Sequence, residues 1–123
     1  MKTTVLLCDD AKIMRVLMRA MLEPSGYFDI VGEAANGVEV VEQYKKLNPG
    51  LVVLDLNLPI RDGHAAAKDI LEFNPDAVIL LVTTKINKPK VEAMQGLGVK
   101  GAVYKPIDKE EFVKAAVKAS GLV

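Results

Sequence analysis

Four continuous apolar runs constrain the fold of this chain more than any other feature of its sequence. They span residues 5–8, 51–54, 78–82 and 101–104. Each is mostly aliphatic and is followed at once by a polar residue. Continuous apolar runs of this length are typical of strands that are buried on both faces of a parallel sheet. The sequence therefore predicts a parallel sheet with cover on both sides.

Segments with a helical period separate these runs. The apolar residues of the first helical segment are Ile13, Val16, Leu17, Ala20 and Met21. Further helices are expected at residues 40–47, 64–73 and 89–95, and from Asp108 onward, where Glu111 gives the spacing of a helix cap. Strands that alternate with helices indicate five strand–helix units with right-handed crossovers, which place helices on both faces of the sheet.

Residues 27–33 form the least hydrophobic of the expected strands because they include Asp29 and Glu33. A strand of this kind suits an edge of the sheet. This position favours the strand order 2-1-3-4-5, in which the first and third strands flank the point where the chain changes direction across the sheet.

Polar residues follow the strands in a pattern that predicts a site. Asp9 and Asp10 come after the first strand, Asp55 ends the third, Thr83 closes the fourth, and Lys105 follows the fifth. The carboxyl ends of parallel strands meet at one edge, so these side chains are expected to form one pocket. Any one of these aspartates alone would be an ordinary exposed residue at the start of a loop, but together they indicate a site.

The expected pocket suits phosphoryl chemistry with a metal. Three neighbouring aspartates repel one another unless some are protonated or a cation binds. Mg2+ prefers oxygen ligands and often binds one or two carboxylates together with phosphate oxygens. Lys105 adds an ammonium and Thr83 a hydroxyl, so the pocket is suited to a dianionic phosphoryl group. An aspartate in such a pocket can itself be the nucleophile and form an acyl phosphate.

Length and composition indicate one intracellular domain. The chain has 123 residues, with 16 basic and 16 acidic side chains, so its charge gives no attraction to nucleic acid or to anionic membranes. The single cysteine, Cys8, is expected in the core. No run is long enough to span a bilayer and none resembles a signal peptide, so we expect a cytoplasmic protein without membrane insertion.

The order and spacing of these residues resemble the receiver domains of response regulators, and among them the single-domain chemotaxis (CheY-like) type. The matching segments are Asp9–Asp10, residues 55–63, Thr83, and Lys105 with Pro106. The resemblance implies a flavodoxin-like three-layer αβα sandwich with a five-stranded parallel sheet. It covers the whole chain, so we expect residues 1–123 to be one receiver domain without an output domain.

The resemblance also implies a role for each site residue. Asp55 would be the phosphoacceptor. Asp10, Asp55 and the backbone carbonyl of Asn57 would bind Mg2+, and Asp9 would hold the metal through water. Lys105 would pair with Asp55 at rest and with the phosphoryl group afterwards, while Thr83 would turn to the phosphoryl oxygen. Pro106 would follow a cis peptide bond, as an X–Pro bond allows.

The implied partners belong to two-component signalling. A histidine kinase, CheA-like in chemotaxis, would supply the phosphoryl group. The target would be a protein such as the flagellar motor switch. The alternatives are a phosphorelay intermediate that passes phosphoryl to a histidine phosphotransfer protein, or a receiver fragment of a larger regulator. At most the protein would catalyse its own phosphorylation and dephosphorylation, so it is not expected to be an enzyme.

The sequence departs from the family at the switch. Many receivers have an aromatic residue three positions before the lysine, where this chain has Ala102. Tyr104 has the same side-chain parity and can substitute in part, or it packs against the last helix. Thr84 stands where the family usually has Ala or Gly. Together with Asn57 and Lys85, it is expected to tune the lifetime of the acyl phosphate.

Three further groups of residues have a simpler interpretation. His64 is expected to be a polar residue in the first turn of a helix, since no partner for catalysis or metal binding lies near it in the sequence. Met14 and Met21 are expected in the core, and Met18 is the methionine of this helix expected at the surface. The lysines at 85, 88 and 90 form either a solvated loop or a basic rim for an acidic partner.

Other functions fit these residues less well. A phosphatase of the dehalogenase kind needs a second aspartate two positions after the nucleophile, where this chain has Asn57. A flavin or nucleotide carrier needs a phosphate-binding loop after the first strand, where Asp9 and Asp10 would repel phosphate without a metal. A pseudo-receiver that only binds proteins would not need the complete set of site residues.

Overall fold

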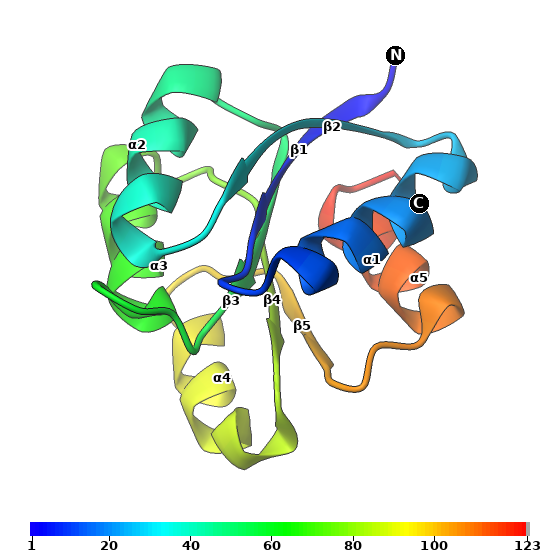
Figure 1. The fold of residues 1–123 in the computed structure, drawn as a ribbon. Helices are drawn as coiled ribbons and strands as arrows, with labels where there is room; N and C mark the ends of the chain where they lie inside the picture. Colours follow the sequence, from blue (N-terminus) through cyan, green and yellow to red (C-terminus); the bar gives the residue numbers. More distant parts are fainter. Residues whose placement is uncertain (123) are drawn as a thin grey trace.

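A five-stranded parallel sheet forms the centre of the protein, as the computed structural model shows for residues 1–122. The strand order is β2-β1-β3-β4-β5, so the predicted order and the edge position of β2 are confirmed. The strands are β1 (Thr3–Cys8), β2 (Phe28–Ala34), β3 (Leu51–Asp55), β4 (Ile79–Thr83) and β5 (Gly101–Tyr104). All four neighbouring pairs are parallel, so the carboxyl ends of the strands lie at one edge of the sheet (Figure 1).

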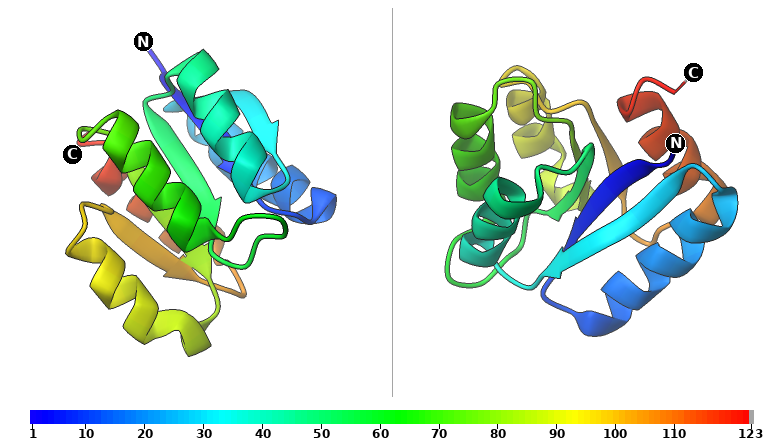
Figure 2. Two further views of the ribbon diagram at one scale, coloured as in Figure 1. Left: turned by 90° about the vertical axis from the view of Figure 1, so that its left-hand side faces the viewer. Right: turned by 90° about the horizontal axis from the view of Figure 1, so that it is seen from above.

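Helices cover both faces of this sheet and make the three layers of a flavodoxin-like fold (Figure 1, Figure 2). Helices α1 and α5 lie on one face, and α2, α3 and α4 on the other. Their bounds are α1 (Lys12–Leu22), α2 (Gly37–Leu47), α3 (Gly63–Phe73), α4 (Lys88–Gln95) and α5 (Lys109–Ala119). Two short 3-10 helices, η1 (Glu23–Ser25) and η2 (Lys85–Asn87), precede β2 and α4. None of the helices within residues 1–122 is both long and apolar enough to cross a membrane.

Alternate residues of the central strands fill two separate cores. Leu6 and Leu54 belong to the core under α2, α3 and α4, whereas Leu7 and Val53 belong to the core under α1 and α5. All four side chains are fully buried. Burial of a side chain of this size stabilises the fold by roughly 1.5–3 kcal/mol. Cys8 is also buried, as predicted, and it belongs to the core under α2, α3 and α4.

Three helices begin with a side-chain cap. Asn36, Asp62 and Asp108 each accept a hydrogen bond from a backbone N–H in the first turn of α2, α3 and α5. The predicted cap of the last helix is among them, because Asp108 accepts from the N–H of Glu111 at 3.0 Å. These caps supply acceptors for N–H groups that have no partner within the helix. Helix α4 differs, because Asn87 at its N-cap position makes no such bond.

The prediction of which face of α1 packs on the sheet was wrong. Met18 is fully buried, while Met14 and Met21 are only partly buried. Ile13 and Val16, which were counted in the apolar stripe, are 65% and 50% exposed. The helix has apolar residues around most of its circumference, so the spacing alone does not show which side packs on the sheet.

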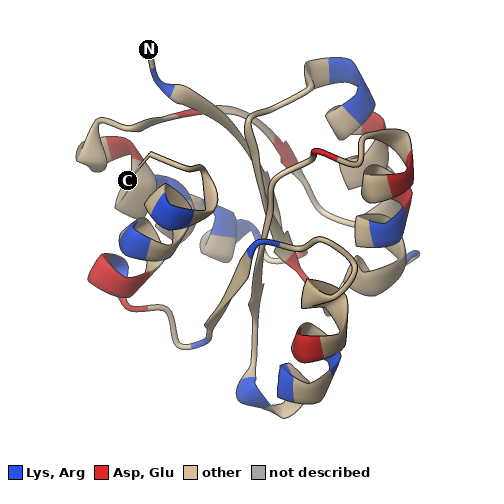
Figure 3. Cartoon of the chain, turned by 180° about the vertical axis from the view of Figure 1, so that it is seen from behind, with Lys and Arg blue, Asp and Glu red and all other residues tan. Residues whose placement is uncertain are grey.

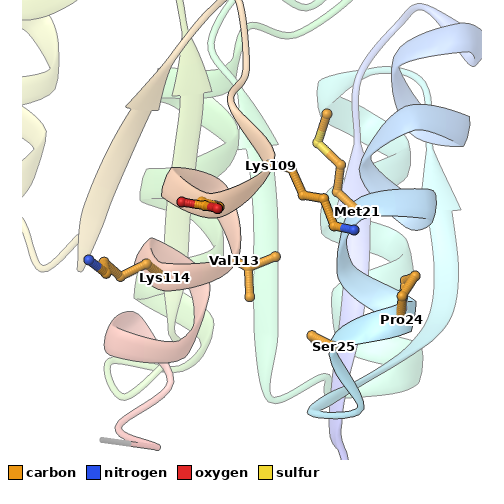
Figure 4. Close-up of a pocket in the computed structure, with 7 residues that line it drawn as sticks. Met21, Pro24, Ser25, Lys109, Val113 and Lys114 are labelled. Carbon is orange, nitrogen blue, oxygen red and sulfur yellow. The ribbon is translucent and has the colours of Figure 1, made fainter.

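A groove runs between α1 and α5 on the face of the sheet opposite to α4 (Figure 4). Met21, Pro24 and Ser25 line one side of it, and Lys109 and Val113 lie on the other. The residues that line this groove include none of the polar residues of the predicted site. It is therefore separate from the acidic edge of the sheet.

The loop between β3 and α3 contains a strained residue. Ile60 has a φ of 69° and is 81% exposed. The N–H of Arg61 donates to the carbonyl of Pro59 at 2.7 Å, so Ile60 is the central residue of a three-residue turn. A branched side chain is unfavourable in this region of φ. Arg61 also fixes the loop to α3, since its guanidinium bonds both carboxylate oxygens of Asp69.

Replacing Ile60 by glycine is therefore expected to raise the free energy of unfolding by about 1 kcal/mol, because glycine adopts positive φ without steric cost. Urea unfolding measures the difference. Ile60→Ala is the matched control. It also removes the exposed side chain beyond Cβ but keeps Cβ, so its free energy of unfolding should rise less than that of the glycine variant. Equal stability of the glycine variant and the wild type would contradict strain at this position.

Candidate functional site

Three carboxylates meet at the carboxyl edge of the sheet, as the sequence predicts. Asp9 follows β1 directly and Asp55 is the last residue of β3, which is the neighbour of β1 in the sheet. One oxygen from each of Asp9, Asp10 and Asp55 lies within 4.8 Å of the others. Asp9 and Asp55 are 1% and 3% exposed, whereas Asp10 is exposed. The cluster therefore has two buried members and one side open to solvent.

Lys105 lies against both buried carboxylates. Its Nζ is 3.1 Å from Asp9 Oδ2 and 3.2 Å from Asp55 Oδ2. The expected pair with Asp55 is present, and the bond to Asp9 is an addition that the sequence did not indicate. Lys105 reaches this position from the end of β5, where its backbone N–H donates to the carbonyl of Thr83 at 2.7 Å.

A hydrogen-bond network holds the loop that carries Asp9 and Asp10. Asp9 Oδ1 accepts from the N–H of Ala11 at 2.9 Å, which closes a tight turn. Arg15 donates to the backbone carbonyl of Asp9 at 2.7 Å and to Glu33 at 2.7 Å. The bond from Arg15 to Glu33, together with one from Arg19, lowers the pKa of Glu33. Glu33 on β2 thus fixes Arg15, and Arg15 fixes the turn.

Asp55 is held by its own loop. The N–H of Asn57 donates to Asp55 Oδ1 at 3.1 Å. Gly63, at the start of α3, packs directly on the backbone carbonyl of Asp55, so that a Cβ atom at position 63 would overlap it. This close approach explains why glycine follows Asp62 here. Any larger residue would push α3 away from the end of β3 and displace Asp55.

Thr83 is fully buried at the end of β4, and its hydroxyl has a partner that the sequence analysis did not identify. The side-chain amide of Asn87 donates to Thr83 Oγ1 at 2.8 Å. Asn87 is the last residue of η2, at the start of α4. The structure thus places Thr83 on the same edge as Asp55 but with its hydroxyl bonded to the segment that leads into α4.

These donors fit a hard divalent cation. The cluster supplies carboxylate oxygens, and one ammonium faces three carboxylates, so an excess of negative charge remains. A divalent ion relieves such an excess, and oxygen ligands with an open side for water are what Mg2+ favours. The acidic cluster is therefore a site that can hold a metal.

Comparison with known families agrees with this arrangement. The family model of the response regulator receiver domain matches residues 5–117. The chain belongs to the response-regulator receiver family. It is thus a receiver domain of the two-component signalling systems, in which histidine kinases supply the phosphoryl group.

Relatives of this receiver include chemotaxis proteins. It is 39% identical to the protein CcdB of Bacillus subtilis over 119 residues, which cover 97% of this chain and 98% of that protein. It is 41% identical to the chemotaxis protein CheY of Halobacterium salinarum over 115 residues, or 94% of each chain. A crystal structure of a CheX–CheY–BeF3–Mg complex from Borrelia burgdorferi contains a similar chain, with a TM-score of 0.85 and 27% identity, covering 94% of this chain and 87% of that one.

The receiver lacks the usual aromatic residue at the switch, and the structure shows what lies there. Ala102 and Tyr104 are both partly buried and pack on the core that contains Val91 and Met94 of α4. The predicted parity of Ala102 and Tyr104 is therefore confirmed. The alternative, in which Tyr104 packs against the last helix, was wrong, because Val103 faces that side.

The remaining predicted residues lie around the receiver site. Thr84 and Lys85 are exposed where β4 leads into η2. Lys88 and Lys90 are exposed in the first turn of α4, and Figure 3 shows the basic residues at this end of the molecule. His64 is partly buried in the first turn of α3, as predicted.

Burial and charge have opposite effects on the receiver site. Burial raises the pKa of Asp55; the Asn57 N–H and Lys105 oppose this rise, and Asp9 adds to it. For Lys105, burial favours the neutral form, but the carboxylates of Asp55 and Asp9 outweigh it and raise its pKa. Burial, with Asp55 and Asp9 nearby, also raises the pKa of the Cys8 thiol, so this cysteine stays protonated.

Asp55→Asn is expected to raise the free energy of unfolding at neutral pH in the absence of Mg2+. Because burial raises the pKa of Asp55, the folded protein binds more protons than the unfolded chain between the ordinary and the raised pKa. The stability of the wild type therefore falls as the pH rises through that interval.

Urea unfolding at neutral pH and below about pH 3.5 tests this. The gain should be present at neutral pH and disappear in acid. Asp29→Asn, at an exposed residue of the edge strand β2, is the matched control and should show no such gain. A variant that is less stable than the wild type at neutral pH would show that the charged form of Asp55 stabilises the fold.

Proposed function

We propose that this receiver is a phosphoacceptor switch in which Asp55 takes a phosphoryl group from a histidine kinase. The observation that carries the proposal is the meeting of Asp9, Asp10 and Asp55 with Lys105 at one edge of the sheet. Two of these carboxylates are buried, and each accepts a bond from the same ammonium. Burying these charges lowers the stability of the fold, and such arrangements are typical of functional sites.

In this proposal Asp10, Asp55 and the backbone carbonyl of Asn57 hold Mg2+, and Asp9 holds it through water. The acidic cluster and the exposure of Asp10 support this set. Mg2+ bound there neutralises charge on the carboxylates and on the phosphoryl oxygens. Lys105 supplies the second positive charge from the side of β5.

The proposed transfer forms one bond and breaks one. A carboxylate oxygen of Asp55 attacks phosphorus, the new O–P bond forms, and the P–N bond to the donor histidine breaks with its electron pair returning to the imidazole. The Asn57 N–H and Lys105 hold the two oxygens of Asp55 in place before the attack. Burial of Asp55 limits the access of water to the acyl phosphate that results.

The product adds about two negative charges to this edge of the sheet. Lys105 then bonds the phosphoryl group, and the Thr83 hydroxyl turns to a phosphoryl oxygen. Thr83 ends β4 and Lys105 directly follows the neighbouring strand β5, so their movement reaches the face formed by α4, β5 and α5. The signal is a change of this surface between a resting and an activated conformation. Phosphorylation shifts the equilibrium between them only as far as the phosphoryl group makes more favourable contacts in the activated one.

Chemotaxis is the signalling process we propose. The CheY relatives support it. A chain that is 27% identical to this one occurs in the CheX–CheY complex from Borrelia burgdorferi, whose structure contains BeF3 and Mg. The upstream partner would be a CheA-like kinase, and the target a protein such as the flagellar motor switch. The exposed Lys85, Lys88 and Lys90 would form a basic rim toward an acidic partner surface.

Incubation with acetyl phosphate and Mg2+ tests the phosphoacceptor role. We expect intact-protein mass spectrometry to show one added phosphoryl group, because small donors can replace the kinase when the metal and Lys105 are in place. The adduct should be absent in Asp55→Asn and without Mg2+. Asp62→Asn, five residues beyond Asn57 in the same loop, is the matched control and should keep the adduct. Equal phosphorylation of Asp55→Asn would place the phosphoryl group elsewhere.

Replacement of Lys105 by alanine separates metal binding from switching. Lys105 pairs with two of the three carboxylates, so its removal should tighten Mg2+ binding, roughly tenfold or about 1.4 kcal/mol. Asp10→Asn should instead weaken it. Isothermal titration calorimetry measures both. The same Lys105 variant should lose binding of a partner that recognises the phosphorylated form, and unchanged partner affinity would exclude the switching role.

A further inference from the structure

Asn87 has a hydrogen bond that neither its position in the sequence nor the proposed phosphoryl transfer requires. Its side-chain amide donates to Thr83 Oγ1 at 2.8 Å. Thr83 is fully buried, and Asn87 is partly buried. A threonine hydroxyl has one proton to donate and two lone pairs that accept. Asn87 therefore fixes the orientation of the hydroxyl that is proposed to turn toward phosphoryl.

The same asparagine stands at the N-cap position of α4 and does not cap it. Asn36, Asp62 and Asp108 occupy this position in α2, α3 and α5, and all three have extended backbones and cap through their side chains. Asn87 has φ −91° and ψ 8°, outside the extended region. Asparagine is among the best capping residues, so α4 begins without a cap although a suitable residue is present.

The resting backbone explains why the cap is not made. Asn87 is the last residue of η2, and its N–H donates to the carbonyl of Thr84 at 3.1 Å. A capping conformation requires an extended backbone at Asn87. This change in ψ breaks the last turn of η2, in which the N–H of Lys88 donates to the carbonyl of Lys85. Pro89, in the first turn of α4, has no N–H, which leaves Lys90 as the N–H that an asparagine cap would accept from.

We propose that Asn87 is a positioning residue with two alternative partners, and this rests on the proposed function of Asp55. At rest it holds the Thr83 hydroxyl. When Thr83 turns to the phosphoryl oxygen, Asn87 loses that acceptor, η2 opens, and the side chain caps α4 through the N–H of Lys90. The exchange changes the surface of η2, where Lys85 and Ile86 are exposed.

This link carries the signal on a route that does not need an aromatic residue at position 102. The small Ala102 cannot follow Thr83 as a large ring would. Asn87 is connected to Thr83 directly by the hydrogen bond and lies four residues along the chain. The start of α4 thus receives the change in Thr83 through one side chain and one turn.

Thr83→Val tests the exchange without phosphorylation. Valine keeps the shape of threonine and removes the acceptor, so Asn87 should cap α4 in the unmodified protein. We expect hydrogen exchange of the Lys90 amide, followed by NMR, to slow roughly fivefold or more relative to the wild type. The wild type with Mg2+ and beryllofluoride, used as a stand-in for phosphoryl, should show the same slowing.

Three further variants make the result specific. Thr84→Val, which changes a neighbouring exposed threonine, should leave Lys90 exchange as in the wild type. Asn87→Ala should abolish the slowing in the Thr83→Val background. Asn87→Ser as a single variant should slow Lys90 exchange, because serine can cap the helix but is too short to reach the Thr83 hydroxyl. This rescue by a second capping residue would not occur if Asn87 only filled space.

The outcomes separate this inference from the proposed function. If acetyl phosphate modifies Asp55 but Thr83→Val leaves Lys90 exchange unchanged, the exchange of partners by Asn87 is wrong and the phosphoacceptor role stands. If Thr83→Val slows Lys90 exchange and no adduct forms on Asp55, the two partners of Asn87 are real and the proposed function fails. Slowing that persists in the Thr83→Val, Asn87→Ala double variant would also overturn the inference.

Discussion

An imbalance of charge at the carboxyl edge of the sheet underlies the rest of this structure. One ammonium, that of Lys105, faces three carboxylates, and it bonds the two that are buried. Burial by itself favours the neutral forms of Asp55 and Lys105. The Asn57 N–H and Lys105 supply donors to the buried carboxylates, and Arg15 holds the backbone of Asp9. A site held in this way is ready to bind a cation and a dianionic group.

The sequence predicts most of the fold because its strongest pattern is also the one with the clearest physical cause. Continuous apolar runs require burial on both faces, so they fix a parallel sheet, and the polar β2 fixes its edge. The polar residues at the strand ends then meet without further assumption. The inner face of α1 was mispredicted because apolar residues surround most of that helix. The expectation of a single domain without an output domain stays a prediction.

Other parts of the site depend on contacts between residues that have no pattern in the sequence. Arg15 reaches Glu33 only because β1 and β2 pair in a particular register. Asn87 precedes a lysine and a proline at a helix start, which would indicate an ordinary cap. The structure instead bonds it to Thr83. Whether a polar side chain bonds its own helix or a neighbouring strand depends on backbone geometry, which spacing does not determine.

The binding position of a divalent ion tests the central claim most directly. Mn2+ in place of Mg2+ broadens the NMR signals of nearby amides, so a titration of the isotope-labelled protein locates the ion. The account predicts that the amides of Asp10, Asp55 and Asn57 broaden first, and that Asp10→Asn and Asp55→Asn each weaken the effect. Broadening that begins instead at another acidic segment, such as Glu110 and Glu111, would contradict a metal centre at the edge of the sheet.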